Sequence, residues 1–162
     1  MQFIGVIPTN IFGEHDNFDL ENSHVIPAIM RKIYEAKLKN KDVILWGDGS
    51  PMRQFTYSKD IAKILIWLAE NKCEYDLINI GDDEERSIQD VAEIISSTLN
   101  FSGNIIWDSS MPSGQIKKTC DMLRLKKLGF GQEEFTKFGE AITSTAIWFE
   151  DNYQEILEKD SS

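Results

Sequence analysis

Short apolar runs alternate along the chain with longer stretches in which apolar residues recur at helical spacing. The short runs are rich in branched or aromatic side chains and are bounded by turn residues, which is typical of strands: Phe3 to Ile7, Val43 to Trp46, Gln54 to Tyr57, Leu77 to Gly81 and Asn104 to Asp108. The longer stretches predict five helices. The first begins near Pro27, and the others cover Asp60 to Asn71, Ile88 to about Leu99, Met122 to Leu128 and Thr136 to about Tyr153. This alternation predicts an α/β protein.

Local signals place several helix starts. Pro27 is tolerated in a first helical turn because the amides of that turn have no partner within the helix, so His24 should lie at or just outside it. Ser58 is expected to cap the second helix. Ser87 with Asp90 resembles a capping box at the start of the third.

The first strand leads into the segment with the densest chemistry. Phe3 to Ile7 predicts a strand that is buried on both faces of a parallel sheet, and the stretch from Pro8 to Pro27 predicts a loop that holds both histidines. Because loops at the carboxyl ends of parallel strands line the ligand crevice, we expect the residues from Pro8 to Ile11 to lie against a cofactor or substrate. An ordinary polar turn is the alternative.

Composition narrows the classes of function. The chain has 162 residues, 41% of them hydrophobic, which suits about one domain with a core. Its longest apolar stretch, Ile64 to Ala69, is far shorter than the roughly 20 residues that a membrane span needs. Cys73 and Cys120 are too few and too far apart for a disulfide framework or a zinc site, so we expect buried or partly buried thiols in a reducing, cytoplasmic compartment.

The net charge of −10 argues against a nucleic-acid partner, and an anionic ligand would need a local positive site. Three places could supply one: Arg31 and Lys32 near the histidine loop, Arg53 after the turn from Gly47 to Pro51, and Lys117 and Lys118 after Ser113 and Gly114. The remaining lysines of the first helix are expected on a solvated face.

Two segments resemble a known enzyme family. PTNIFG, HDNF and NSHVIPA between Pro8 and Ala28, together with WGDGSPMRQFTYSKD from Trp46 to Asp60, are similar to the GDP-L-fucose synthases of the extended short-chain dehydrogenase/reductase superfamily. The resemblance runs through essentially the whole chain. That family carries a Gly-rich dinucleotide fingerprint and a Ser with a Tyr-x-x-x-Lys pair upstream of the strand at Phe3, and neither occurs here.

We therefore expect residues 1–162 to be the C-terminal, substrate-binding half of such an enzyme, without the N-terminal dinucleotide-binding half, and to contribute strands that would complete a Rossmann sheet. In isolation the strand from Phe3 to Ile7 would lose neighbours, and an unpaired apolar edge favours self-association. For the intact enzyme the resemblance implies a homodimer.

The resemblance also implies a reaction: GDP-4-keto-6-deoxy-D-mannose is epimerised at C3 and C5 and then reduced at C4 by NADPH. His24 aligns with the family's catalytic histidine, and an imidazole suits the acid that returns a proton after epimerisation. Pro8, Asn10 and Ile11 would contact the nicotinamide end of NADPH. His15 is expected to shape the loop through turn hydrogen bonds.

By the same resemblance, Lys32, Trp46, Arg53 and Lys118 would bind the GDP-sugar, since a guanidinium forks onto diphosphate oxygens, lysines add point charges and an indole offers a flat face. Two positions depart from the family. Ser113 stands where an aspartate is expected, and Lys32 stands where some relatives have arginine. Because the family's catalytic cysteine belongs to the absent half, neither cysteine of this chain should take its role.

Two alternatives stay open. A non-catalytic protein that binds a GDP-sugar would also lack the catalytic Tyr and Lys. A related nucleotide-sugar dehydratase or epimerase would share the segment around Arg53 but should lack the sequence context of His24.

Overall fold

The structure is a computed structural model that describes residues 3–112 and 114–160. Ser113, one of the two departures from the family pattern, lies outside the described residues. Helices and strands alternate as the sequence predicts, in this order: β1 Gly5–Pro8, β2 Asn10–Phe12, α1 Val25–Leu38, β3 Val43–Trp46, β4 Met52–Tyr57, α2 Ser58–Glu70, β5 Leu77–Ile80, β6 Glu85–Ser87, α3 Ile88–Thr98, β7 Ile105–Asp108, β8 Lys117–Lys118, α4 Leu123–Lys127, the 3-10 turn Gln132–Glu134 and α5 Phe138–Asp160.

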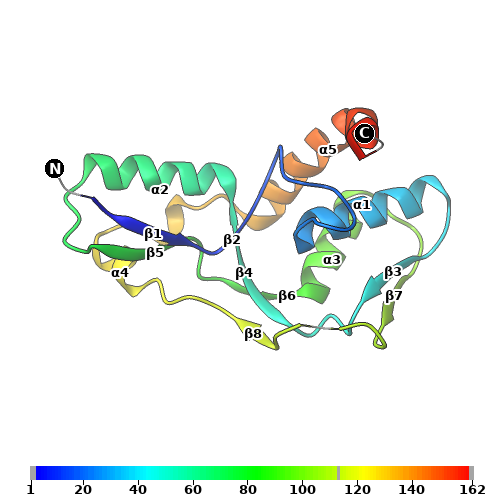
Figure 1. Ribbon diagram of the computed structural model, residues 1–162, viewed down its shortest axis with the longest axis horizontal. Coiled ribbons are helices and arrows are strands. Elements are labelled where there is room, and N and C mark those ends of the chain that lie inside the picture. Colours follow the sequence, from blue (N-terminus) through cyan, green and yellow to red (C-terminus); the bar gives the residue numbers. More distant parts are fainter. Residues whose placement is uncertain (1–2, 113, 161–162) are drawn as a thin grey trace.

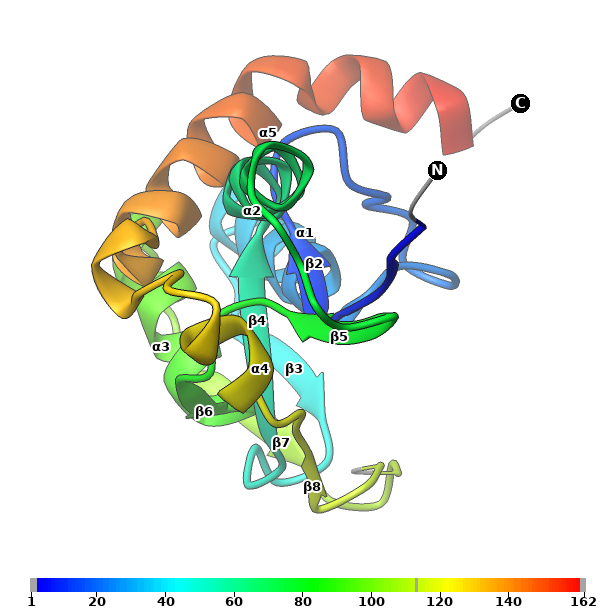
Figure 2. The same cartoon turned by 90° about the vertical axis from the view of Figure 1, so that its left-hand side faces the viewer.

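The molecule is elongated, with β4 running between its two ends (Figure 1). At one end β1 pairs with β5 in parallel beneath α2, and at the other end β3 pairs with β7 in parallel. Between them β4 pairs with β2 and β8 in parallel and with β6 in antiparallel orientation. Viewed along the long axis, α5 lies above the strands on the same side as α2 (Figure 2).

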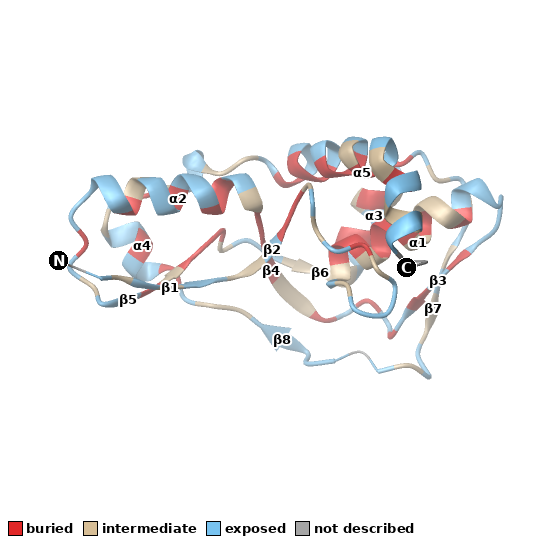
Figure 3. Cartoon of the chain, turned by 45° about the horizontal axis from the view of Figure 1, so that its top comes forward, coloured by how far each residue is buried: buried red, intermediate tan, exposed pale blue. Residues whose placement is uncertain are grey.

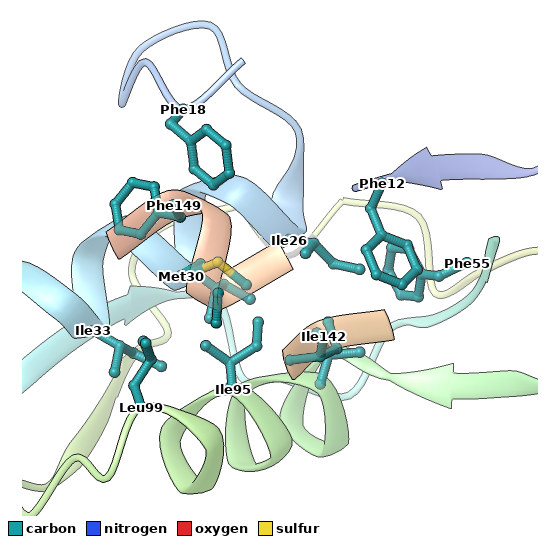
Figure 4. Close-up of a cluster of buried hydrophobic side chains, with 14 of the residues drawn as sticks. Phe12, Phe18, Ile26, Met30, Ile33, Phe55, Ile95, Leu99, Ile142 and Phe149 are labelled. Atoms are coloured by element: carbon teal, nitrogen blue, oxygen red, sulfur yellow. The ribbon is translucent and has the colours of Figure 1, made fainter. Parts of the chain in front are cut away.

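Two separate hydrophobic cores flank β4. The larger core joins α1, α3 and α5 to β3 and to one face of β4, and Figure 4 shows Met30, Ile95 and Phe149 interleaving there. The smaller core packs α2 against β5 and α4, with Ile64 and Ile78 fully enclosed. Phe12 and Phe55, adjacent in Figure 4, mark the point where β2 and β4 reach the larger core.

The first strand differs from the prediction in two respects. It begins at Gly5, and the chain stays extended past Pro8 into β2, so the loop begins only after Phe12. The prediction of two buried faces is wrong: Ile7 is 44% exposed and Phe3 is 78% exposed. The reason is that among the described residues β1 pairs only with β5 and that α2 covers one face of this pair; most of β1 is coloured as exposed or intermediate in Figure 3.

The other elements that the sequence predicts are present, and they differ from the prediction only in their ends and in one cap. The residue before α2 is Tyr57, which makes no side-chain cap, so Ser58 does not have the predicted capping role. Ser87 and Asp90 do form a capping box on α3. The short strands β6 and β8 were not predicted. No helix in the described part of the chain is long and apolar enough to cross a membrane.

Candidate functional site

A cavity of about 310 Å³ lies where β1 passes into β2, beside the start of α1. Five of the eight predicted site residues line it, and its full lining is Pro8, Thr9, Asn10, Ile11, His24, Gln54, Lys118 and Cys120. The residues come from segments more than a hundred positions apart in the sequence. The structure therefore brings the residues predicted to contact the cofactor, the predicted catalytic histidine and one predicted anion-binding lysine to one place.

The wall formed by β2 is fixed by polar side chains. Thr9 Oγ1 lies 2.6 Å from Thr56 Oγ1, which accepts a hydrogen bond from Asp82 N at 2.8 Å. Gly81, with φ of 140°, leaves room for the threonine pair, since a Cβ there would stand 2.5 Å from Thr9 Oγ1. Asn10 Nδ2 donates to the Gln54 carbonyl at 2.7 Å. These bonds tie the segment to β4 where a ligand would contact it.

His24 is the residue that precedes the first turn of α1, as predicted. Its carbonyl accepts the hydrogen bond of Ala28 N at 3.0 Å, but its side chain makes no capping bond and is exposed at the cavity. The imidazole is therefore not used by the helix. Burial raises the pKa of the nearby Asp16 carboxyl, while the backbone hydrogen bond from Asn17 and the charge of His24 act in the opposite direction.

The loop between Phe12 and His24 is tied to the rest of the protein near its start and is braced by hydrogen bonds of its own farther on. At its start Glu14 accepts hydrogen bonds from the Tyr57 hydroxyl at 2.7 and 2.8 Å and pairs with Lys59 Nζ at 2.7 Å. Burial tends to raise the pKa of Glu14, but the hydrogen bonds from Lys59 and Tyr57 outweigh it and lower that pKa. Farther on, Asp19 Oδ1 accepts the backbone amides of Glu21 and Asn22.

Two residues of this region have roles other than those predicted. Arg31 was expected in the anion site, but it is 6% exposed, donates to the Phe18 carbonyl at 3.1 Å and pairs with Glu35 at 2.9 Å, so it anchors the loop. His15 was expected to make turn hydrogen bonds. Instead its ring packs on Trp148 at 4.6 Å, and its backbone has a φ of 64°.

Arg53 and Lys118 are direct neighbours across β4 and β8. Arg53 is half-buried, and its Nη1 donates to the Met52 carbonyl at 2.7 Å. A Cβ on Gly114, whose φ is 74°, would lie 3.6 Å from Arg53 Nη2, so the turn before β8 comes up against the guanidinium. Lys117, the other predicted lysine of β8, is instead paired with Glu85 at 2.6 Å.

Lys32, midway along α1, lies beside Trp46, the last residue of β3. The Lys32 ammonium lies 4.7 Å from the centre of the Trp46 ring, which is a cation–π distance. Burial lowers the pKa of Lys32, while the indole is 58% exposed on β3. An exposed indole beside a cation offers a flat and positive surface for an aromatic anion such as a nucleotide.

The predicted cations share an electrostatic property. In the described part of the chain, no carboxylate lies within ion-pairing distance of Lys32, Arg53 or Lys118. In a protein with a net charge of −10, cations without carboxylate partners leave a local positive field, as an anion site requires.

Two lining residues were missed by sequence reasoning. Gln54 lies between Arg53 and Phe55 on β4, and because successive side chains of a strand point to opposite faces, it points to the face that they do not occupy. Cys120, two residues after Lys118, also lines the cavity. The period of β4 could have indicated the first, while nothing local indicates the second. Cys73 is buried and Cys120 is partly buried, as expected. Among the described residues no group of His, Cys, Asp and Glu side chains could hold a metal ion.

Comparisons with known proteins agree with this geometry. Residues 1–81 match the profile of the NAD dependent epimerase/dehydratase family. The GDP-L-fucose synthase of Dictyostelium discoideum is 43% identical over 155 residues, which cover 94% of this chain and 48% of that protein. The GDP-L-fucose synthase of Escherichia coli (strain K12) is 37% identical over 157 residues, covering 91% of this chain and 48% of that protein.

The fold comparison gives the same result. The crystal structure of a GDP-L-fucose synthetase from Naegleria fowleri bound to NADP superposes with a TM-score of 0.87 and 41% identity, covering 94% of this chain and 48% of that one. The chain thus spans about half the length of the relatives that it matches. Because the matched profile covers residues 1–81 of 162, the protein belongs to the NAD dependent epimerase/dehydratase family.

Proposed function

We propose that this chain is the substrate-binding half of an epimerase-reductase that converts GDP-4-keto-6-deoxy-D-mannose to GDP-L-fucose, and that it is inactive alone. The observation that carries the proposal is the cavity that joins His24 to the strand from Pro8 to Ile11 and to Lys118. Its support from similarity is the identity of 37–43% to proteins named GDP-L-fucose synthase.

The predicted binding residues would contact different parts of the GDP-sugar. Arg53 and Lys118 would hold the diphosphate, because they are cross-strand neighbours and a guanidinium can fork onto two phosphate oxygens. Trp46 would stack on the base, with Lys32 beside it. The sugar would then extend toward His24 and the cavity, whose volume of about 310 Å³ is within the range of small-molecule sites.

The epimerisation places a clear demand on His24. A base from the other half of the enzyme would take a proton from the carbon next to the 4-keto group, because the resulting carbanion delocalises into an enolate. Inversion follows when an acid returns a proton to the opposite face. The His24 imidazole lines the cavity without a competing capping bond, so it can donate that proton and regain one from solvent.

The reduction at C4 involves the cavity wall. When bound, NADPH supplies the hydride for this step. Pro8, Asn10 and Ile11 would contact the nicotinamide end, since they line the same cavity as His24. The hydrogen bond from Asn10 Nδ2 to the Gln54 carbonyl helps to keep this wall in place.

A second reading has one specific observation in its favour. The tyrosines that precede residue 100 are followed four positions later by Leu38, Ile61 and Asn79, so none belongs to a Tyr-x-x-x-Lys pair. A protein that binds a GDP-sugar without converting it would fit this sequence equally well.

Calorimetric titration separates these readings. The chain and its Arg53→Ala and His24→Ala variants are titrated with GDP-L-fucose, GDP and UDP-glucose, and turnover of the keto-sugar with NADPH is measured with and without an added cofactor half of a GDP-L-fucose synthase. We expect GDP-selective binding that is lost in Arg53→Ala and kept in His24→Ala. Turnover that requires the added half and His24 supports the epimerase-reductase, and binding without any turnover supports the binding protein. Preference for UDP-glucose contradicts both.

A further inference from the structure

Gln54 is a buried polar residue that fastens two segments together. Only 4% of it is exposed, and its amide is fully engaged. Gln54 Oε1 accepts from Cys120 N at 2.7 Å, and Nε2 donates to the Cys120 carbonyl at 3.1 Å and to the Asp83 carbonyl at 3.3 Å. One side chain thus binds both backbone groups of a residue that lies 66 positions later.

The segment that Gln54 holds is the one that carries Lys118. β8 consists of Lys117–Lys118 alone, and both residues are exposed at the edge of β4. Before β8 the chain is held by Met52 N, which donates to the Ile116 carbonyl at 2.8 Å. After β8 it is held by the Gln54 bonds at Cys120 and by a bond of 3.0 Å from Asn79 Nδ2 to the Asp121 carbonyl.

The side chain of Lys118 projects from a short edge strand, and only the backbone beneath it is held. It makes no ion pair within the described residues, and a two-residue edge strand supplies few backbone bonds. A lysine side chain loses rotamer freedom when its ammonium is held in one place, and a mobile backbone beneath it would weaken any contact with an anion further. The placement of its ammonium beside Arg53 therefore depends on how well the flanking backbone is held.

We propose that Gln54 is a positioning residue that sets Lys118 beside Arg53 and thereby controls the affinity of the site for a diphosphate. The inference rests on the proposed function, because it assumes that this pair of cations binds the diphosphate of a GDP-sugar. Gln54 acts through the backbone of residues 116–120 and not by contact with the ligand.

A double-mutant cycle tests the proposal. GDP is titrated calorimetrically into the wild-type chain, Gln54→Met, Lys118→Ala and the double variant. Methionine keeps the length and approximate volume of the glutamine without its hydrogen bonds. We expect each single change to weaken binding about three- to tenfold, and the double variant to bind no more weakly than Lys118→Ala alone.

Two control variants separate this effect from general damage. Thr145→Val removes a buried hydroxyl that donates to the Ala141 carbonyl on α5, so it should lower stability but leave GDP affinity unchanged. Lys117→Ala removes the adjacent lysine, whose partner is Glu85, and should also leave the affinity unchanged.

Losses that add in the double variant would overturn the proposal, because they would mean that Gln54 contacts the ligand or acts independently of Lys118. Hydrogen exchange measured by mass spectrometry supplies a readout that needs no ligand. Residues 116–120 should exchange faster in Gln54→Met than in Thr145→Val, and equal rates would contradict the proposal. A folded wild-type chain that binds no GDP would contradict the proposed function, and the exchange rates alone would then decide whether Gln54 holds the segment.

Discussion

Tyr57→Phe removes one hydroxyl from the anchor of the histidine loop and leaves the rest of the side chain in place. The hydroxyl donates to Glu14 at 2.7 and 2.8 Å, while the ring is 5% exposed and packs near Phe12 with centroids 5.9 Å apart. A hydrogen bond to a charged acceptor contributes about 1.5–3 kcal/mol. Because phenylalanine preserves the packing, we expect the free energy of unfolding to fall by about 2 kcal/mol at neutral pH.

The same bond should make this loss depend on pH. Burial tends to raise the pKa of Glu14, but the hydrogen bonds from Lys59 and Tyr57 lower it from its ordinary value of 4.5. A carboxyl whose pKa is lower in the folded than in the unfolded state stabilises the protein above the unfolded-state pKa, and this contribution is lost as the pH falls through the folded-state pKa. The cost of Tyr57→Phe should therefore shrink in acid, where Glu14 is protonated and only a neutral hydrogen bond is lost.

Urea denaturation followed by circular dichroism measures both effects. Tyr34→Phe is the matched control, since the Tyr34 ring packs against Phe149 and Tyr153 and its hydroxyl makes no hydrogen bond that the described residues show. The reasoning is refuted if Tyr57→Phe costs no more than Tyr34→Phe at neutral pH. It is also refuted if the cost is the same above and below the folded-state pKa of Glu14.

Three further predictions concern other parts of the molecule. Asp60→Ala removes a buried carboxylate that accepts hydrogen bonds from Thr136 N and Oγ1, both at 2.9 Å. Thermal or urea denaturation should show a free energy of unfolding lower by about 2–3 kcal/mol, and Asp60→Asn should lower it less. Ile7→Lys places a charge on the uncovered face of β1, and sedimentation should show less self-association than in the wild type, whereas an unchanged distribution would contradict a role for this face. Trp46→Ala should weaken GDP binding about tenfold through lost stacking, and Lys32→Ala should weaken it less; equal losses would contradict the stacking role.

The periodic elements could be predicted from the sequence because their signals are local. β3 matches the apolar run from Val43 to Trp46 at both ends, and the capping box of Ser87 and Asp90 starts α3 at the expected residue. Local signals do not predict which side chains of a strand are buried. Ile7 belongs to a run that predicts a strand buried on both faces, yet it is exposed. Burial depends on what covers a strand, and the pattern within the strand does not contain that information.

The residues of the candidate site could be predicted where the resemblance to the family indicated them. Local sequence signals alone indicated only some of them. The position of His24 could be predicted from Pro27, because proline is tolerated in the first turn of a helix and His24 lies three residues before it. Arg31 looked like a member of the anion site, but its true role depends on the Phe18 carbonyl and Glu35, of which the first lies on a loop with no periodic signal. Gln54 became visible only with Cys120 beside it, because their pairing spans 66 positions.

The pairing pattern of the strands also bears on how the chain reaches this structure. No strand in the described residues pairs with the strand next to it in sequence: β1 joins β5, β3 joins β7, and β4 joins β2, β6 and β8. Gly5 meets Leu77 and Met52 meets Lys117, so long loops must close before any strand gains a partner. Such non-local contacts slow folding, because the chain loses conformational entropy in closing a long loop before the contacts that offset this loss can form. We expect helical signal to precede strand pairing when refolding is followed by stopped-flow circular dichroism, and a newly made chain to expose its apolar strand edges for longer than a hairpin protein of equal length.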